Sequence, residues 1–216
     1  MSRPWPWFGG RPAHPILSVM DSDGELLLRL RSGDERAFVS LVERYHQPML
    51  HLAASFVPSR AVAEEVVQDT WLALLRGLEG FEGRSSLKTW LFRILVNRAR
   101  TTGAREQRSV PVADPEPVVD PTRFDGSGGW ADPPEHWIEV AEGRLQAGKL
   151  AYRIRAWIDE LPARQREVVL LRDVEGMSSE EVCTVLALSE GNQRVLLHRG
   201  RSRLRQLFED EFREVR

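Results

Sequence analysis

Apolar residues recur at intervals of three and four positions along two long stretches of this chain. One apolar stripe consists of Phe38, Leu41, Val42 and Tyr45, and a second consists of Val62, Val66, Val67, Leu74 and Leu75, with Trp71 beside it. This spacing places apolar side chains on one face of an α-helix, and strand patterns are weak throughout. The expected helices cover residues 25–31, 34–56, 61–78 and 85–105, then 145–160, 163–174, 178–186 and 189–212. The pattern therefore predicts an all-α fold.

The segment 109–135 interrupts the helical pattern. It is rich in proline and glycine, and its acidic residues outnumber a single basic residue, Arg123. Proline removes backbone donors and glycine raises chain entropy, so such a segment buries little surface. We therefore expect two small helical domains, at residues 21–108 and 136–216, joined by a flexible acidic Pro/Gly linker at 109–135. Residues 1–20 are expected to form a mobile tail, unless translation starts at Met20.

The composition of the chain excludes several classes of protein. The 216 residues include 30 basic and 32 acidic side chains, a net charge of −2 that argues against a wholly basic protein but allows local basic patches. The single cysteine, Cys183, excludes an intrachain disulfide and a cysteine-rich zinc site, and a cytoplasmic setting is the default expectation. No apolar run is long enough for a membrane helix, so membrane insertion is not expected.

Catalytic signatures are also missing from the sequence. It contains no glycine-rich phosphate loop and no HExxH motif, and its histidines lack the spacing of metal ligands. We therefore expect no catalytic residues, no metal and no cofactor.

The segment SEGNQRVLLHRGRSRLR near the C-terminus is strongly basic, and no acidic residue occurs between Gly191 and Phe208. A short helix precedes it, for which Ser178 is the expected N-cap and Glu181 the capping-box partner. Ala187 and Leu188 form the expected turn. A short helix, a tight turn and a longer basic helix predict a helix-turn-helix whose second helix enters the DNA major groove. The alternative is a helical hairpin with a solvated, arginine-rich face.

Two blocks of sequence carry a family resemblance. The stretch IDELPARQREVVLLRDVEGMSSEEV resembles the C-terminal domain of the extracytoplasmic-function (ECF) sigma factors, small alternative sigma subunits of bacterial RNA polymerase. The stretches SGDERAFVSLVERYHQPMLHLA and AEEVVQDTWLALLRGLEGFEGRSSLKTWLFRILVNRAR are similar to the first conserved domain of that family. The resemblance implies a non-enzymatic subunit that binds core RNA polymerase and promoter DNA and directs transcription initiation. It also implies an anti-sigma factor that holds the protein inactive until a signal arrives.

In the N-terminal domain, the resemblance implies two sets of binding residues. The expected contacts to core polymerase, through its β′ clamp, are Glu64, Glu65, Gln68, Asp69, Trp71 and Leu72. The expected contacts to the minus-ten promoter element, which the domain would also melt, are Phe81, Arg84, Ser85, Ser86, Lys88, Asn97, Arg98 and Arg100. The loop Phe81–Ser86 would hold a flipped base, whereas Trp90 is expected to be structural. Without the resemblance, an ordinary solvated helix face with Trp71 in the core would be the favoured interpretation of the first set.

In the C-terminal domain, the resemblance implies that the second helix reads the minus-thirty-five element. The expected contacts are Ser189, Asn192, Arg194, Val195, His198, Arg199, Arg201 and Arg203. Arginine and asparagine offer paired hydrogen bonds to guanine and adenine, whereas Arg201 and Arg203 are expected to hold phosphates. Gln193, Val195 and Leu196 depart from the family pattern. Apolar side chains at Val195 and Leu196 are unusual for a face that reads bases, so either the helix is rotated slightly or one of these two residues packs inward.

Two further expectations remain open. The acidic linker either threads toward the polymerase active-site cleft and RNA exit channel or is a solvated spacer. Within core polymerase, the expected partners of the chain are the β′ clamp and the β subunit. The runner-up function is a free-standing helix-turn-helix transcriptional regulator, which would bind DNA without polymerase.

Overall fold

The computed structural model describes residues 23–106 and 147–213, and every regular element in these ranges is a helix. The all-α prediction is confirmed. The predicted tail at residues 1–20 and the predicted linker at 109–135 lie outside the described residues, so the domain limits stay a prediction.

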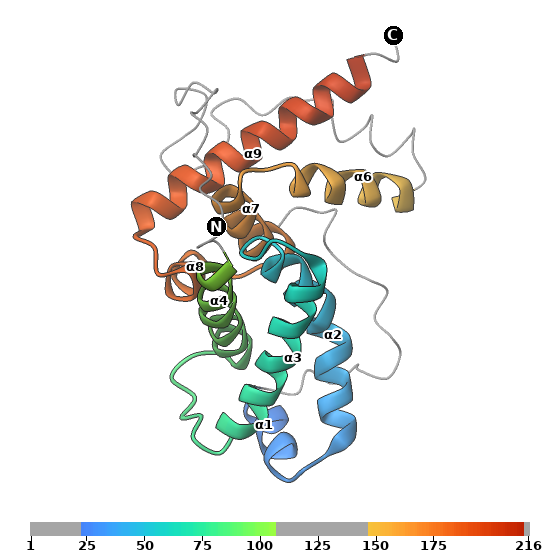
Figure 1. The fold of residues 1–216 in the computed structure, drawn as a ribbon. Helices are drawn as coiled ribbons and strands as arrows, with labels where there is room; N and C mark the ends of the chain where they lie inside the picture. Colours follow the sequence, from blue (N-terminus) through green and yellow to red (C-terminus); the bar gives the residue numbers. More distant parts are fainter. Residues whose placement is uncertain (1–22, 107–146, 214–216) are drawn as a thin grey trace. The chain divides into compact units, whose positions relative to one another are not determined.

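The first described range forms helices at the positions that the hydrophobic pattern predicts (Figure 1). They are α1 (Asp23–Arg31), α2 (Glu35–Ala53), α3 (Arg60–Gly77) and α4 (Leu87–Glu106). Asp34 caps α2 by accepting hydrogen bonds from the backbone N–H groups of Arg36 and Ala37, and Ser59 caps α3 in the same way through Val62. These caps satisfy backbone donors that have no partner inside the helix.

The second described range is also helical. Its elements are α6 (Ala147–Asp159), α7 (Ala163–Val169), the π-helix η3 (Leu170–Val174), α8 (Ser179–Leu186) and α9 (Glu190–Arg213). The predicted capping box is confirmed, because the Ser178 hydroxyl accepts from the Glu181 N–H and the Glu181 carboxylate accepts from the Ser178 N–H. The predicted turn follows α8, where Ala187 adopts the left-handed conformation (φ 53°).

Contacts divide the described residues into two compact units. The first unit contains α1 to α4 together with residues Met177–Leu188, which include α8. The second contains α6, α7, η3 and α9.

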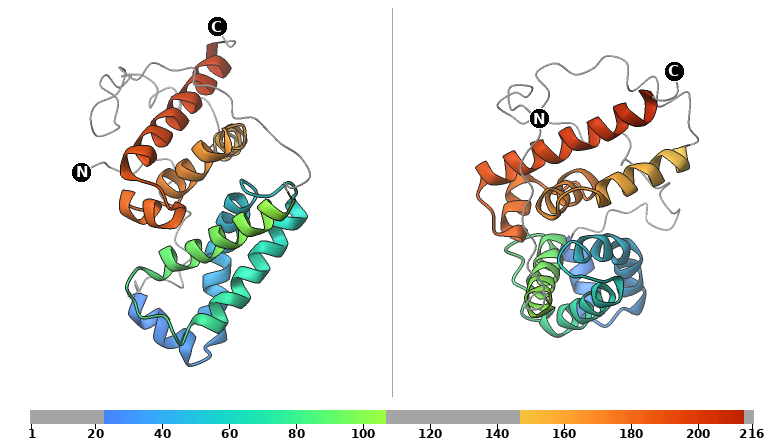
Figure 2. Two further views of the ribbon diagram at one scale, coloured as in Figure 1. Left: turned by 60° about the vertical axis from the view of Figure 1, so that its left-hand side comes forward. Right: turned by 45° about the horizontal axis from the view of Figure 1, so that its top comes forward.

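The core of the first unit is the seam where α2, α3 and α4 pack side by side (Figures 1 and 2). From α4 the buried residues are Leu87, Leu91, Phe92, Leu95, Val96 and Ala99. Phe92 meets Tyr45 of α2 edge to face, with ring centroids 6.0 Å apart. One member of the predicted stripes differs, because Leu75 is exposed at the surface of α3.

The second unit depends on close packing between α7 and α9. Gly200 of α9 faces α7 so closely that an added Cβ would lie 2.7 Å from a methyl carbon of Val169. Beyond α7, the Glu175 N–H bonds to the Leu170 carbonyl at 2.9 Å, which is the five-residue spacing of a π turn. The sequence pattern predicts a single helix over 163–174 and does not reveal this π turn.

We expect Gly103→Ala to destabilise the first unit. A Cβ at this position in α4 would lie 2.1 Å from the carbonyl oxygen of Phe56, so the backbone must move. Overpacking of this kind costs about 1–3 kcal/mol, more than the helix propensity gained by replacing glycine. Urea denaturation followed by circular dichroism would measure the loss. Ala104→Ser, at the exposed neighbouring position, is the control, and equal stability of the two variants would contradict the prediction.

Candidate nucleic-acid interface

The outer face of α3 is polar with an apolar edge. Glu65, Gln68 and Asp69 are exposed, and Leu72 beside them is 48% exposed. Glu64 is half-buried and pairs with Arg60 at 2.9 Å. An exposed leucine next to carboxylates suits a partner that offers both apolar and basic groups.

Trp71 lies apart from this face. Its side chain is only 8% exposed and packs edge to face on Phe38 of α2, with centroids 5.8 Å apart. Its indole nitrogen has no hydrogen-bond partner among the described residues. The structure therefore places Trp71 in the core of the first unit, and its predicted contact with a partner stays a prediction.

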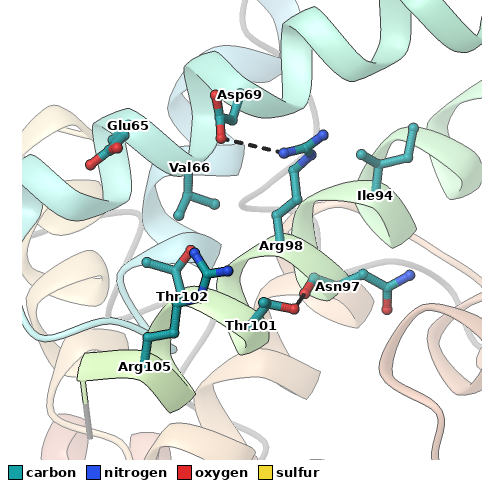
Figure 3. A pocket seen from close by; sticks show the side chains of 9 residues that line it. All are labelled: Glu65, Val66, Asp69, Ile94, Asn97, Arg98, Thr101, Thr102 and Arg105. Atoms are coloured by element: carbon teal, nitrogen blue, oxygen red, sulfur yellow. Dashed lines mark hydrogen bonds and ion pairs between the residues drawn. The ribbon is translucent and has the colours of Figure 1, made fainter.

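A groove of about 470 Å³ runs between α3 and α4 (Figure 3). Its lining residues are Glu65, Val66, Asp69, Ile94, Asn97, Arg98, Thr101, Thr102 and Arg105. The α3 side supplies carboxylates and the α4 side supplies guanidinium groups. Arg98 reaches across to Asp69 with an N–O distance of 3.3 Å, so the groove brings together one residue from each predicted N-terminal binding set. Both side chains are solvent-accessible, and an exposed pair of this kind is readily exchanged for another partner.

The loop between α3 and α4 is buried at its beginning, at Phe81, and exposed over residues 82–85, which we call the crest. The ring of Phe81 is buried against Trp90, with centroids 4.7 Å apart, and this contact agrees with the structural role expected for Trp90. Arg84 and Ser85 are exposed, and Arg84 pairs with Glu82 at 3.1 Å. The crest is therefore accessible to a ligand, whereas the Phe81 ring is not.

Ser86 and Lys88 lie at the start of α4 and already have intramolecular partners. The Ser86 hydroxyl accepts from the Thr89 N–H at 3.1 Å, which makes Ser86 the N-cap of the helix. It also donates to the Glu181 carboxylate at 3.0 Å, and the Thr89 hydroxyl donates to the same oxygen at 2.7 Å. The Lys88 ammonium lies 5.8 Å from the centre of the Tyr45 ring.

The Glu181 carboxylate is held in its charged form. Burial alone would raise its pKa, but hydrogen bonds from the Ser178 backbone and from the Thr89 and Ser86 hydroxyls together lower it. Glu181 is therefore ionised at neutral pH and accepts all three hydrogen bonds.

Further along α4, the predicted DNA contacts differ in accessibility. Asn97 is exposed and Arg98 is half-buried at the groove. Arg100 donates to the carbonyl oxygen of Leu186 at 2.6 Å, and its guanidinium lies 5.6 Å from the centre of the Phe56 ring. Within the first unit, Arg100 is thus engaged in packing.

The first turns of α9 divide sharply between inward and outward positions. Gln193 is 1% exposed and, with Leu197 and Gly200, forms a buried stripe at helical spacing. Asn192 and Arg194 are exposed, and Val195 is 47% exposed, whereas Leu196 is half-buried. Gln193, for which the sequence did not predict an inward position, is thus buried, and Val195 faces the solvent. The Ser189 hydroxyl accepts from the Asn192 N–H at 3.3 Å and caps the helix.

Comparison with known proteins identifies the family to which the chain belongs. The model of Sigma-70 region 2 matches residues 41–109, and that of Sigma-70 region 4 matches residues 152–204. The RNA polymerase sigma-H factor of Pseudomonas aeruginosa is 30% identical over 197 residues, which cover 91% of this chain and 99% of that protein. The chain belongs to the ECF sigma factors. The ECF RNA polymerase sigma-E factor of Escherichia coli is also 30% identical, over 86% of this chain and 93% of its own length.

Solved structures show the same fold. CnrH, in complex with the cytosolic domain of CnrY, is 25% identical with a TM-score of 0.52 and covers 87% of this chain and 97% of its own. RpoE of Bartonella quintana, in complex with the anti-sigma factor NepR, is 24% identical with a TM-score of 0.51 over 88% and 98% of the two chains.

This sigma factor therefore binds core RNA polymerase and promoter DNA and directs transcription initiation, as the resemblance predicts. Its family consists of non-catalytic polymerase subunits. Within residues 23–106 and 147–213, no helix is long and apolar enough to cross a membrane, and no cluster of side chains could hold a metal ion.

Two residues of the predicted minus-thirty-five set have distinctive surroundings. Arg201 forms a two-pronged ion pair with Asp173 of η3, at 2.6 and 3.0 Å, and the side chains are only 18% and 9% exposed. This pair gives Arg201 a role inside the second unit, and its predicted phosphate contact is untested. Burial, then the neighbouring charges of Arg199 and Arg201, lower the pKa of His198, so its imidazole is neutral at pH 7.

Sequence reasoning missed Asp23 and Arg31, at the two ends of α1. Both make hydrogen bonds to the α3–α4 connection. An acidic residue in the first turn of a helix and a basic residue in the last are ordinary complements to the helix dipole, so no local signal distinguishes them.

We expect Gln193→Ala to change the stability of the protein and Val195→Ala to change its promoter preference. Gln193→Ala removes a buried polar side chain and should lower the free energy of unfolding by about 1–2 kcal/mol. Val195→Ala should leave stability unchanged and alter the preferred minus-thirty-five sequence, because the exposed side chain can contact a thymine methyl group. Urea denaturation and selection from a promoter library would measure both effects. The orientation of α9 would be contradicted by a stable Gln193→Ala variant with altered promoter choice.

Arg201 and Arg203 form a second matched pair. Arg201→Ala leaves the Asp173 carboxylate without its guanidinium and should cost about 2 kcal/mol of stability. Arg203→Ala removes an exposed charge, so stability should hold while the salt dependence of promoter binding falls by about one unit of slope. Thermal denaturation and binding titrations at several salt concentrations would separate the two. Equal loss of stability in both variants would refute the assignment.

Proposed function

We propose that this sigma factor reads its promoters at two elements through the residues that the structure leaves accessible. The exposed face at the start of α9, with Asn192, Arg194 and Val195, contacts bases of the minus-thirty-five element. The observation that carries this proposal is the buried stripe of Gln193, Leu197 and Gly200, because it turns those three side chains outward together.

The Arg194 side chain is available for base contact. It pairs with Glu190 at 3.6 Å, but both side chains are largely exposed, so the pair contributes little and DNA can replace it. Asn192 and Arg194 carry the paired donors and acceptors that distinguish adenine and guanine in the major groove. His198 and Arg199 are half-buried and lie one turn further along the helix.

The minus-ten element is bound, in this proposal, by the crest of the α3–α4 loop and by α4. Arg84 and Ser85 at the crest meet the captured base, and Asn97 and Arg98 contact the adjacent strand. Phe81 contributes by shaping the loop, since its ring is buried. Base capture by a shaped pocket beside cationic groups is a known route to holding an opened strand.

Core polymerase binds the outer face of α3, with Leu72 as the apolar contact and Glu65, Gln68 and Asp69 around it. Because Asp69 also pairs with Arg98, a basic group of the polymerase that takes Asp69 would leave Arg98 available to DNA phosphates. This exchange links polymerase binding to promoter binding in one groove.

The remaining roles follow from the family. We propose that an anti-sigma factor holds the protein inactive, as a partner protein is bound to CnrH and to RpoE in their structures. We also propose that the chain acts in the cytoplasm, where polymerase meets the chromosome, and that it has no catalytic site of its own.

Promoter-specific initiation is the direct test. Purified protein, mixed with sigma-free core polymerase and a promoter library, should start transcription from a defined set of sequences. Leu72→Ala should weaken core binding by about fivefold or more without loss of stability, because an interface anchor is worth more than about 1 kcal/mol. Leu28→Ala, at another exposed leucine, is the control and should bind core normally.

Three results would contradict the proposal. The first is promoter binding by the chain alone without any initiation, which would favour a free-standing regulator. The second is normal core binding by Leu72→Ala, and the third is equal loss in both leucine variants.

A further inference from the structure

The loop between α3 and α4 is held at its beginning by Arg31, the last residue of α1. The Arg31 guanidinium donates to the backbone carbonyls of Leu78 at 3.1 Å, Glu79 at 3.2 Å and Phe81 at 2.6 Å. A planar guanidinium has donors in a fixed fork, so three carbonyls on one group constrain the path of the backbone. The contacts join positions 47 to 50 residues apart in the chain.

The same helix holds the other end of the loop. Asp23, the first residue of α1, accepts the backbone N–H of Leu87 at 3.0 Å. Leu87 is the first residue of α4, and a first-turn N–H has no acceptor within its own helix. Asp23 therefore supplies from another element an acceptor that the start of α4 requires, next to the local cap made by Ser86.

These contacts make α1 a rigid brace across the loop. The helix has nine residues, so its ends stand roughly 12 Å apart, and one end holds each side of the connection. The Phe81 ring packs against Trp90. Between Phe81 and Leu87, only the crest, residues 82–85, is fully exposed. The crest that faces the solvent is thus short and fixed at both sides.

We propose that Asp23 and Arg31 are positioning residues that set the base selectivity of the loop Phe81–Ser86. The inference rests on the proposed function of that loop in capturing an unpaired base. A loop that is ordered before binding loses less conformational entropy on binding and presents its groups at defined positions, so right and wrong bases differ more in affinity. A loose loop would adapt to several bases and lose selectivity.

The test compares Arg31→Ala and Asp23→Ala with conservative and neighbouring controls. Asp23→Asn keeps an acceptor oxygen and Arg31→Lys keeps a donor, so both should restore part of the wild-type behaviour. Arg29→Ala is the matched control, since Arg29 lies on the same helix and pairs with Asp34 at 2.9 Å.

Two measurements are made on each variant. Hydrogen exchange on the full chain alone reports the order of residues 78–87, and exchange there should become about tenfold faster in the two alanine variants. Transcription with core polymerase from a library randomised at the minus-ten element reports base preference. Discrimination at the captured position should fall by about tenfold, while preference at the minus-thirty-five element stays unchanged.

The outcomes separate this inference from the proposed function. Faster exchange with unchanged minus-ten preference would show that the two residues only stabilise the fold, and would overturn the inference. Unchanged exchange in both alanine variants would overturn it as well, as would an equal loss of selectivity in Arg29→Ala. Failure of the wild-type chain to initiate at all would overturn the proposed function and this inference together.

Discussion

The burial of one face of α4 is the constraint on which the proposed promoter-binding surface of the first unit depends. Leu91, Phe92, Leu95, Val96 and Ala99 have no exposed surface, and each large apolar side chain contributes about 1.5–3 kcal/mol when it is fully buried. The helix therefore cannot rotate about its axis without exposing several of them. Since the side chains of a helix radiate at fixed angles, the same packing sets the directions of Asn97 and Arg98.

The groove between α3 and α4 follows from this arrangement. Two amphipathic helices that share a core leave their polar flanks side by side, and here one flank is acidic and the other basic. The Asp69–Arg98 pair joins one residue of the face proposed to bind polymerase to one residue proposed to bind promoter DNA. In the proposed function, polymerase and DNA therefore approach neighbouring side chains.

In the second unit, burial of one face likewise fixes the rotation of a helix, here α9. The stripe of Gln193, Leu197 and Gly200 fixes the rotation of α9, and close approach at Gly200 brings it against α7. The Arg201–Asp173 ion pair adds a directional contact, because a bidentate guanidinium–carboxylate pair tolerates little rotation. The π turn at Leu170–Val174 carries Asp173, so an irregularity of the backbone takes part in holding the helix proposed to read DNA.

The sequence by itself determined the positions of the helices, the cap at Ser178, the turn at Ala187 and the family. These features depend on residues within a few positions of one another or on long matching motifs. Only the tertiary structure decided that Trp71 and Gln193 face inward, that Val195 faces outward, and that Arg201 is paired with Asp173. It also revealed that Asp23 and Arg31 hold the α3–α4 loop. Each of these features depends on a partner far along the chain, or on a rotation of a helix by a fraction of a turn. Local periodicity does not contain that information, because a helix of given amphipathicity can be packed in more than one orientation.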